Sequence, residues 1–547
     1  MSIPNLPGVS VTVRDGAFAS TAGLGTDRCA IVGTCTGGTA NTVYEFTDLQ
    51  TLVSTLGTSV SGGPAVEAAA LILAVSGKPV VVVPTTNGTA GSVGTVTRTG
   101  TGPDPGAAFT GTPLDAYNLR IKITLGGTVG TARFRIAFDG DNPDGPTYSD
   151  EYVTAASVTT WVASTGLTVT FAAGTYVVND VYSAACVAPT YTNTNLNTAL
   201  TALLADSRTW RFVFVVGEPS TVSTGATMAS TLDTALTTAQ NAYRYAWGLI
   251  QAPSDTDANI QGAYSSFSSR RVAVAAGFET VTSVISGRTF SRGAAWATAA
   301  RAMAMTISQD LGEVRAGPLS AVTALTRDER KTPGLDASGF LTHRSIVGLN
   351  GAFVCNPRIM APAGSDFLLI QYRQVMDVAC TVGYSALLQY VNAELVTNED
   401  GTLDEVEAQG IDAAVTAALA QSLTQPNYAT AVSATADRTN NVLSTQTLKV
   451  KIRVQPKGYA KAIEAEIGFL NPNLVVTLRR IKDGAQDIHL PVEEDGRVLV
   501  EDTGKKGTFP VLDLNLPYAP TRHRLRVRTA HSRSEGHEAF EHLPGSG

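Results

Sequence analysis

The order of strand-like and helix-like segments is the feature that most constrains the fold. Arg28–Gly33 is a β-rich run, and Lys78–Pro84 is a continuous valine run typical of a strand buried on both faces. Between them, Thr47–Gly57 and Val66–Ala74 carry apolar residues at helical spacing. Further helices are expected at Leu196–Leu204, Thr224–Ala242 and Ala294–Ile307, and further strands at Trp210–Val216, Ala246–Ala252 and Arg271–Gly277. This order predicts one α/β domain that is interrupted.

The interruption is residues 91–189, where Gly and Thr dominate. Apolar residues alternate at period two in Leu119–Leu125, Phe134–Phe138 and Leu167–Phe171, with glycine-containing turns between these runs. Such alternation is typical of half-buried antiparallel strands. The block is predicted to be an inserted all-β, sandwich-like domain.

After Pro318 the pattern changes again. Helices are expected at Phe367–Leu388 and Leu403–Leu423, followed by a half-exposed strand at Leu448–Val454 with Ala462–Phe469 as its hairpin partner. The predicted segments are an extended N-terminal arm (1–20), the first part of the α/β core (21–90), the inserted β-rich surface domain (91–189), the second part of the core (190–318), a C-terminal domain with long helices and a strand pair (319–472), a β-rich extension or arm (473–530) and a polar tail expected to be disordered (531–547).

Composition narrows the class of protein. With 547 residues, 44% of them hydrophobic and 16% charged, the chain can build real cores, which excludes charge-driven disorder. A net charge of −7 disfavours a nucleic-acid partner. Five scattered cysteines predict neither a disulfide framework nor a zinc site. Apolar stretches fall short of the ~18–20 residues that span a bilayer, so we expect no membrane anchor.

The sequence predicts no catalytic, cofactor or metal site. His537 and His542 flank a zincin-like stretch, but they are five residues apart rather than the four that place both side chains on one helical face. No G-x-S-x-G motif occurs, and His343 is the only histidine before residue 489. We expect His343 to lie on a surface helix rather than in an acid–base centre.

The N-terminal residues predict an arm. Pro7 and Gly8 precede Val9, Val11 and Val13, which alternate at period two with no nearby segment to pair with. A lone strand leaves its backbone donors and acceptors unpaired, so this segment is expected to add to a sheet of another subunit.

Taken in order, four segments resemble the sheath protein of contractile phage tails and related contractile injection systems. They are Leu6–Val11, Arg28–Gly33, Ser365–Met376 (which contains Tyr372-Arg373-Gln374) and Asp437–Tyr459. The resemblance covers about residues 1–95 and 190–470. Gln374 stands where the family often has a second Arg, and the 75 residues after position 472 extend beyond the point where many members end.

The resemblance implies an α/β sheath core with extended terminal arms. It also implies a non-enzymatic subunit that assembles in six-fold rings around an inner tail tube, meets baseplate and tail terminator proteins, and works in the virion after assembly in the bacterial host cytoplasm. Contraction of the helical array drives the tube through a cell envelope, and the subunits bind no nucleotide or other cofactor.

The resemblance further implies three sets of contact residues. The inter-subunit arm contains Pro7, Gly8, Val9, Val11 and Val13; the inter-subunit strand pair contains Leu448, Val450, Ile452 and Val454; and the tube contact, on a short helix within Leu335–Val347, contains Asp336, His343 and Arg344.

Two other readings remain open. One is a different phage structural protein, such as a tube, baseplate or surface-layer subunit. The other is an α/β enzyme with a β-sandwich appendage, against which the missing acid–base constellation argues.

Overall fold

A computed structural model describes residues 27–57 and 63–468, together with six short strands between Val476 and Ala539. The chain divides into two compact units, Met1–Tyr459 and Ala460–Gly547. The arm residues Pro7, Gly8, Val9, Val11 and Val13 lie outside the described residues. In the described part, no helix is both long and apolar enough to cross a membrane.

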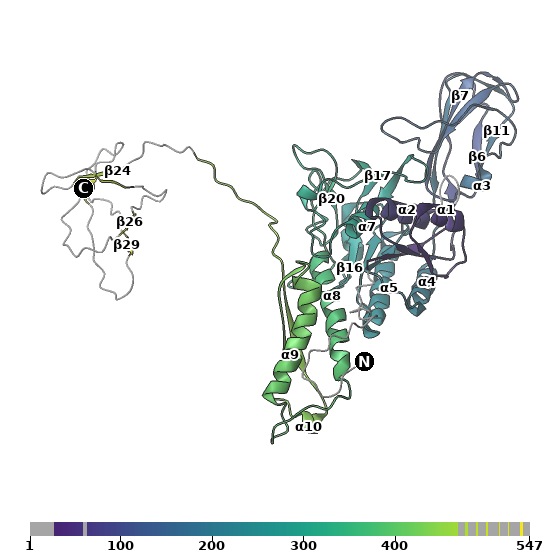
Figure 1. Cartoon of the computed structure of the whole chain (residues 1–547). Coiled ribbons are helices and arrows are strands. Elements are labelled where there is room, and N and C mark those ends of the chain that lie inside the picture. The colour runs from purple at the N-terminus through teal and green to yellow at the C-terminus, as the bar shows by residue number, and fades with distance from the viewer. Residues whose placement is uncertain are drawn as a thin grey trace, which may run out of the picture. The chain divides into compact units, whose positions relative to one another are not determined.

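The first unit is built on a six-stranded sheet with the order β16-β15-β14-β1-β3-β2 (Figure 1). Five strands are parallel, namely β1 (Cys29–Gly33), β3 (Val80–Pro84), β14 (Phe212–Val215), β15 (Trp247–Gln251) and β16 (Val272–Ala275). At one edge β2 (Tyr44–Phe46) pairs antiparallel with β3. Every residue of the parallel strands is buried, as the continuous apolar runs predict.

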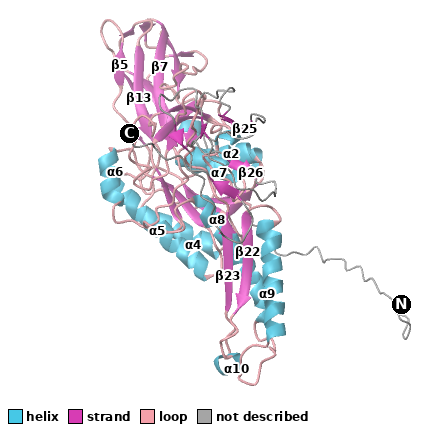
Figure 2. Cartoon of the chain, turned by 90° about the vertical axis from the view of Figure 1, so that its left-hand side faces the viewer, coloured by secondary structure: helices cyan, strands magenta, loops and turns pink. Residues whose placement is uncertain are grey.

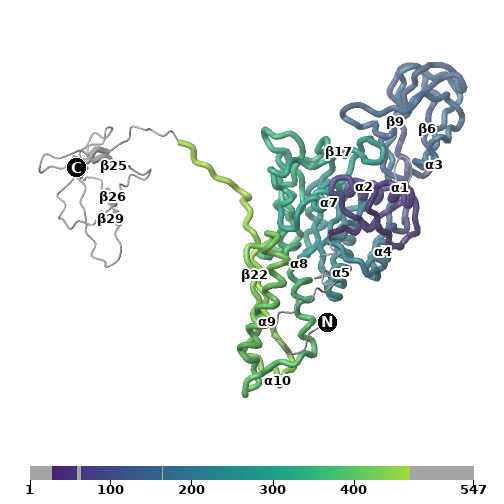
Figure 3. The backbone as a smooth tube through the Cα atoms, viewed as in Figure 1, coloured from purple at the N-terminus to yellow at the C-terminus, as the bar shows by residue number. Residues whose placement is uncertain are grey.

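Helices cover both faces of this sheet. One face packs on α1 (Leu49–Leu56), α2 (Pro64–Ser76) and α7 (Ala295–Ala304). The other packs on α4 (Asn193–Ala205), α5 (Val222–Asn241) and α6 (Asp257–Tyr264). Figure 3 shows α2 beside α7, although residues 77–294 separate them in sequence. The predicted α/β core helices and strands are confirmed.

The regular secondary structure of residues 92–187 is almost entirely strand. They form β4 (Ser92–Val93), β5 (Thr97–Thr99), β6 (Ala107–Gly111), β7 (Tyr117–Leu125), β8 (Gly127–Thr128), β9 (Arg133–Ala137), β10 (Tyr152–Val153), β11 (Leu167–Phe171), β12 (Thr175–Tyr176) and β13 (Val181–Val187), with a one-turn helix α3 (Val162–Thr165). An aromatic core fills this region, in which the Phe134 and Phe171 ring centroids are 4.8 Å apart. Phe290 from outside the block joins this core, so an independent inserted domain stays a prediction.

A second small sheet follows, in the order β18-β17-β19. Its strands are β17 (Phe278–Thr282), β18 (Thr289–Gly293) and β19 (Val322–Leu325), and the 3-10 turn η1 (Val314–Ala316) precedes β19. A hairpin of β20 (His343–Arg344) and β21 (Phe353–Val354) comes next. The predicted helix within Leu335–Val347 is wrong, because residues 335–339 form only turns and the chain then becomes extended. The Leu341 N–H donates to Val274 and its carbonyl accepts from Ala276, at the edge of the central sheet.

The last part of the first unit carries the long helices. These are α8 (Ile370–Leu387) with η2 (Leu388–Tyr390), and α9 (Glu405–Leu419) with a π-helical turn η3 (Ala420–Thr424). Strand β22 (Ala429–Ala436), the one-turn α10 (Val442–Thr445) and β23 (Val450–Pro456) follow. The two predicted helices are confirmed, but the predicted hairpin partner Ala462–Phe469 is wrong: β23 pairs with β22, because small buried residues of β22 close a core against α9.

The second unit contains short strands. They are β24 (Val476–Arg479), β25 (Ile488–Leu490), β26 (Leu499–Glu501), β27 (Asp513–Leu514), β28 (His523–Arg524) and β29 (His537–Ala539). Four of them follow the order β25-β24-β27-β28, and β26 pairs with β29. Apart from β29, the predicted tail 531–547 lies outside the described residues.

Candidate assembly surfaces

Strands β22 and β23 form a two-stranded ribbon, which we call the ribbon. In its register Ala434 lies opposite Ile452, and Ser433 lies opposite Arg453. Because side chains alternate along a strand, Ala434 and Ile452 face the helices while Ser433 and Arg453 face outward. Figure 2 shows the ribbon alongside α9. The inner face packs on a core made by α8 and α9, and the outer face is exposed.

Of the two outer edges of the ribbon, the β23 edge is open among the described residues. On the β22 edge, the Ala434 N–H donates to Thr416 Oγ1 at 3.0 Å and the Ala436 N–H donates to Asp412 Oδ1 at 2.6 Å, so α9 covers part of that edge. Among the described residues, β22 pairs only with β23 and β23 pairs only with β22. An unpaired edge is a row of N–H and C=O groups that can accept a further strand. The predicted strand-pair residues Val450, Ile452 and Val454 are half-buried on β23, and Leu448 precedes it. All four pack on the chain's own core, so a partner strand would bind at an edge rather than on these side chains.

The helix and ribbon are joined by a polar clamp. The Arg438 Nε donates to Glu405 at 2.7 Å, and its Nη2 donates to Asp412 at 2.9 Å. These two carboxylates raise the pKa of the guanidinium. Asp404 caps the start of α9 by accepting from the Val406 N–H at 2.9 Å. The clamp therefore holds the turn after β22 against the beginning of α9.

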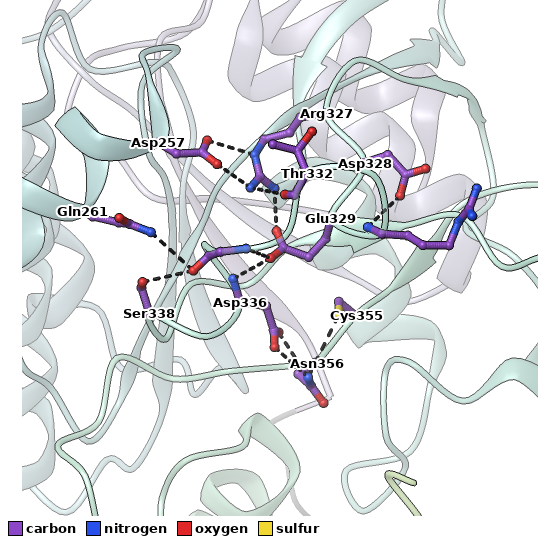
Figure 4. Close-up of polar contacts among 12 residues, drawn as sticks. Asp257, Gln261, Arg327, Asp328, Glu329, Thr332, Asp336, Ser338, Cys355 and Asn356 are labelled. Atoms are coloured by element: carbon purple, nitrogen blue, oxygen red, sulfur yellow. Dashed lines mark hydrogen bonds and ion pairs between the residues drawn. The ribbon is translucent and has the colours of Figure 1, made fainter. Parts of the chain in front are cut away.

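A polar network occupies the region predicted to contact the tube (Figure 4). Arg327 binds Asp257 through two N–H groups, at 2.7 and 3.0 Å, and Glu329 at 2.5 Å. Glu329 in turn accepts from the backbone N–H groups of Gly334 and Asp336. The Asp336 carboxylate accepts from Asn356 at 2.9 Å. Asp336 is thus half-buried and bound within its own chain.

His343 is buried, which contradicts the predicted surface helix. Its Nδ1 lies 2.7 Å from Glu279 Oε2, and its Nε2 lies 2.9 Å from Thr298 Oγ1. Burial raises the pKa of the Glu279 carboxyl, while the nearby His343 opposes that rise. The line of Thr, His and carboxylate resembles a hydrolase relay, but Glu279 and Thr298 are fully buried and His343 is 2% exposed. The arrangement therefore ties β20 to β17 and α7.

The three predicted tube-contact residues are neighbours, but they do not share one exposed surface. Arg344 is half-buried, like Asp336, and follows the buried His343. Sequence reasoning missed the His343 partners because Glu279 and Thr298 are distant in the chain. An isolated histidine gives no spacing signal from which such partners could be found.

Gln374, the departure from the sheath pattern, has a clear structural role. Its Oε1 accepts from the Nε and Nη2 atoms of Arg211, at 3.0 and 2.6 Å. The Arg211 Nη1 also donates to the Met305 carbonyl at 2.9 Å. Next to it, Arg373 binds Asp377, whose pKa burial raises. These residues anchor the start of α8 to the core.

Within the described residues, no group of three or more His, Cys, Asp or Glu side chains is arranged to hold a metal ion. The described cysteines are free, and burial raises the pKa of the Cys35 thiol to about 12.

Comparison with solved structures finds contractile sheaths. The contracted helical sheath of the anti-feeding prophage matches with a TM-score of 0.47 at 11% identity, over 86% of this chain and all of that one. The sheath tail protein of Listeria innocua matches with a TM-score of 0.41 at 12% identity, over 78% of this chain and 94% of that one. The sheath tail protein of Desulfitobacterium hafniense gives 0.43 at 10% identity, over 82% and all of the respective chains.

These structural neighbours are sheath proteins, the family that the sequence pattern resembles. No curated protein matches the sequence. Two family models do match, "DUF2586, N-terminal domain" over residues 6–358 and "DUF2586, C-terminal domain" over residues 366–474. The chain therefore belongs to the DUF2586 family.

Proposed function

We propose that this chain is a structural subunit of a contractile tail sheath. It polymerises helically around an inner tube by strand exchange and contracts to drive the tube through a cell envelope. Its partners are further copies of itself in six-fold rings, the tube protein, and the baseplate and terminator proteins of a phage tail. It assembles in the bacterial host cytoplasm, and residues 91–189 form its outward-facing domain.

The observation that carries this proposal is the open ribbon. A two-stranded sheet whose β23 edge has no partner among the described residues is incomplete within one chain, whereas α9 side chains cover part of its β22 edge. Strands from other copies complete this sheet, and the first of these is the N-terminal arm that contains Val9, Val11 and Val13. At roughly 0.5–1.5 kcal/mol per backbone hydrogen bond, some five bonds contribute a few kcal/mol per strand. Because every subunit of a helical array makes the same bonds, this small free energy per strand is sufficient to hold the array together.

A second donor strand follows the ribbon. In the segment 462–467, Ile463 and Ile467 are 84% and 93% exposed and alternate with Glu464 and Glu466. That period-two pattern is typical of a strand with one apolar face, yet no described strand pairs with it. We include this segment in the C-terminal arm, upstream of the predicted extension or arm at 473–530.

The test is assembly of the purified chain. Electron microscopy and sedimentation should show tubes or polysheaths. Deletion of residues 1–14 should abolish them while leaving the melting temperature nearly unchanged, because the arm's bonds form between chains. Deletion of residues 531–547 is the matched truncation and should leave assembly intact. A full-length chain that stays monomeric across salt and concentration would contradict the proposal, and filaments from the chain lacking 1–14 would exclude strand exchange through this arm.

We place the tube contact at the segment that contains Asp336, His343 and Arg344 and ends in β20. The buried His343 anchors this segment to the core, and Arg344 is its half-buried charged side chain. Arg344→Glu should reduce pelleting with purified tube and leave tube-free polysheath unaffected, because exposed ion pairs are individually weak but are repeated in every subunit. Unchanged pelleting with the tube would move the contact to another surface.

A further inference from the structure

The outer face of the ribbon is basic. Lys451 and Arg453 are exposed on it, and their cross-strand neighbours are Thr435 and Ser433. No ion pair to either basic side chain occurs in the described part of the chain. We call Lys451 and Arg453, with the hydroxyl residues opposite them, the basic face.

One end of the same region is acidic. The segment 394–407 contains Glu394, Glu399, Asp400, Asp404, Glu405 and Glu407 and no Lys or Arg. Glu394 and Glu399 are exposed, and neither forms an ion pair within the described residues. We call this segment, together with α10, the acidic tip. Figure 1 shows α10 and one end of α9 at the same extremity of the first unit.

The acidic tip also exposes apolar side chains. Val396 is 61% exposed, Val406 is 77% exposed and Leu443 is 72% exposed. The tip is held in shape, because the Leu443 N–H donates to the Gly401 carbonyl and Asn441 donates to the Asp400 carbonyl at 2.7 Å. Apolar groups within a charged rim are typical of a protein contact.

The two surfaces do not face each other within one chain. Ile452 points inward to the core beneath the ribbon, where α9 lies, so its neighbours Lys451 and Arg453 point away from α9. The acidic first turn of α9 is therefore on the opposite side of the ribbon from the basic face.

We infer that the acidic tip of one copy docks on the basic face of a second copy. This inference rests on the proposed function and names a contact that strand exchange does not supply. The occupant is a second copy because the two surfaces have opposite charge and belong to the same chain, and Glu394 and Glu399 on one, like Lys451 and Arg453 on the other, form no ion pair among the described residues. Such a contact joins two different patches, so it is heterologous and propagates as a ring or an open helix.

Charge exchange tests this contact. Lys451→Glu with Arg453→Glu, or Glu394→Lys with Glu399→Lys, should each raise the protein concentration needed for half-maximal sedimentation by about tenfold at ~0.1 M salt. The chain that carries all four substitutions should recover assembly, because the charges are again opposite. At ~1 M salt the Debye length falls to ~3 Å, so the wild type should need a protein concentration for half-maximal sedimentation closer to that of the double variants.

The matched control lies on another exposed strand face. Arg133 and Arg135 are two residues apart on β9, as Lys451 and Arg453 are on β23, and both are exposed. Arg133→Glu with Arg135→Glu should not change sedimentation. All variants should nearly retain the wild-type melting temperature and circular dichroism spectrum, because every substituted side chain is exposed. Arg133→Glu also removes an ion pair with Glu151 at 3.1 Å, but a surface pair of this kind contributes little to stability.

The outcomes separate the two proposals. Loss in both double variants with recovery in the fourfold variant supports the contact. If the wild type forms polymers and the double variants assemble equally well, the contact is overturned and the sheath proposal stands. The same holds if the double variants lose assembly and the fourfold variant does not recover it. Recovery of tube pelleting alone, without recovery of self-assembly, would assign the tip to the tube and overturn the contact between copies. A wild-type chain that never assembles overturns both.

Discussion

The central sheet and the ribbon show two different ways to use β-structure. In the sheet, both faces of β1, β3, β14, β15 and β16 are buried under helices of the same chain. In the ribbon, one face is buried and the other is exposed, and the β23 edge has no strand partner among the described residues. Both faces of the sheet are covered within one chain, whereas the β23 edge of the ribbon presents backbone N–H and C=O groups to which another strand can hydrogen-bond. The same backbone chemistry thus completes a covered sheet in one place and, in the other, leaves an edge that the proposed function assigns to strand exchange.

The largest expected difference between the two regions is in core truncation. Phe212 is fully buried and stacks on Trp247 at 4.6 Å, so Phe212→Ala should cost about 3–5 kcal/mol of unfolding free energy. Ile452 is half-buried, so Ile452→Ala should cost only about 1–2 kcal/mol. Urea unfolding of dilute protein measures both, and equal losses would contradict the difference between the two regions.

A pH-dependent effect is expected at the edge of the core. Glu67 on α2 accepts from the Ser283 hydroxyl at 2.8 Å, and burial raises its pKa to about 7, opposed by Arg292. A raised folded-state pKa means that the folded protein holds the proton more tightly. Stability associated with this group is therefore full below the ordinary pKa and is lost as pH rises through about 7.

Glu67→Gln should remove this dependence. At pH 8 the variant should be more stable than wild type by up to about 3 kcal/mol, and the difference should shrink below pH 5. Melting curves from pH 5 to pH 8 measure the effect. Parallel pH profiles for the two proteins would show that Glu67 does not titrate in this range. The difference in stability between Ile452→Ala and wild type, by contrast, should not change with pH, because both proteins contain Glu67.

The smallest expected effect is at the clamp. Arg438 is half-exposed, so its pairs with Glu405 and Asp412 are screened by solvent. Arg438→Ala should lower the melting temperature by no more than about 2 °C, and Arg438→Lys should lower it less. A large drop would show that the clamp contributes to the subunit fold as strongly as the central sheet does.

The core was predictable because its pattern is local. The valine run at Lys78–Pro84 and the helical spacing in Thr224–Ala242 each indicate an element without reference to the rest of the chain. The hairpin partner of β23 was not predictable in this way. Both β22 and Ala462–Phe469 could form a strand, and the choice depended on packing against α9, which no local pattern records.

His343 shows the same limit for a single residue. Its polar neighbours in the sequence indicated a surface position, but the pairing of β20 with β21 places it among Glu279 and Thr298. Gln374 shows the same limit, because its partner Arg211 is 163 residues away in the sequence.

The sequence by itself determined the α/β class, the positions of the core strands and helices, and the resemblance to sheath proteins, because periodicity and order act over neighbouring residues. The tertiary structure decided which strand pairs with β23, which charged side chains are buried with partners, and which edges and faces stay open. These depend on contacts between segments far apart in the chain, where burial and hydrogen bonding outweigh local preference.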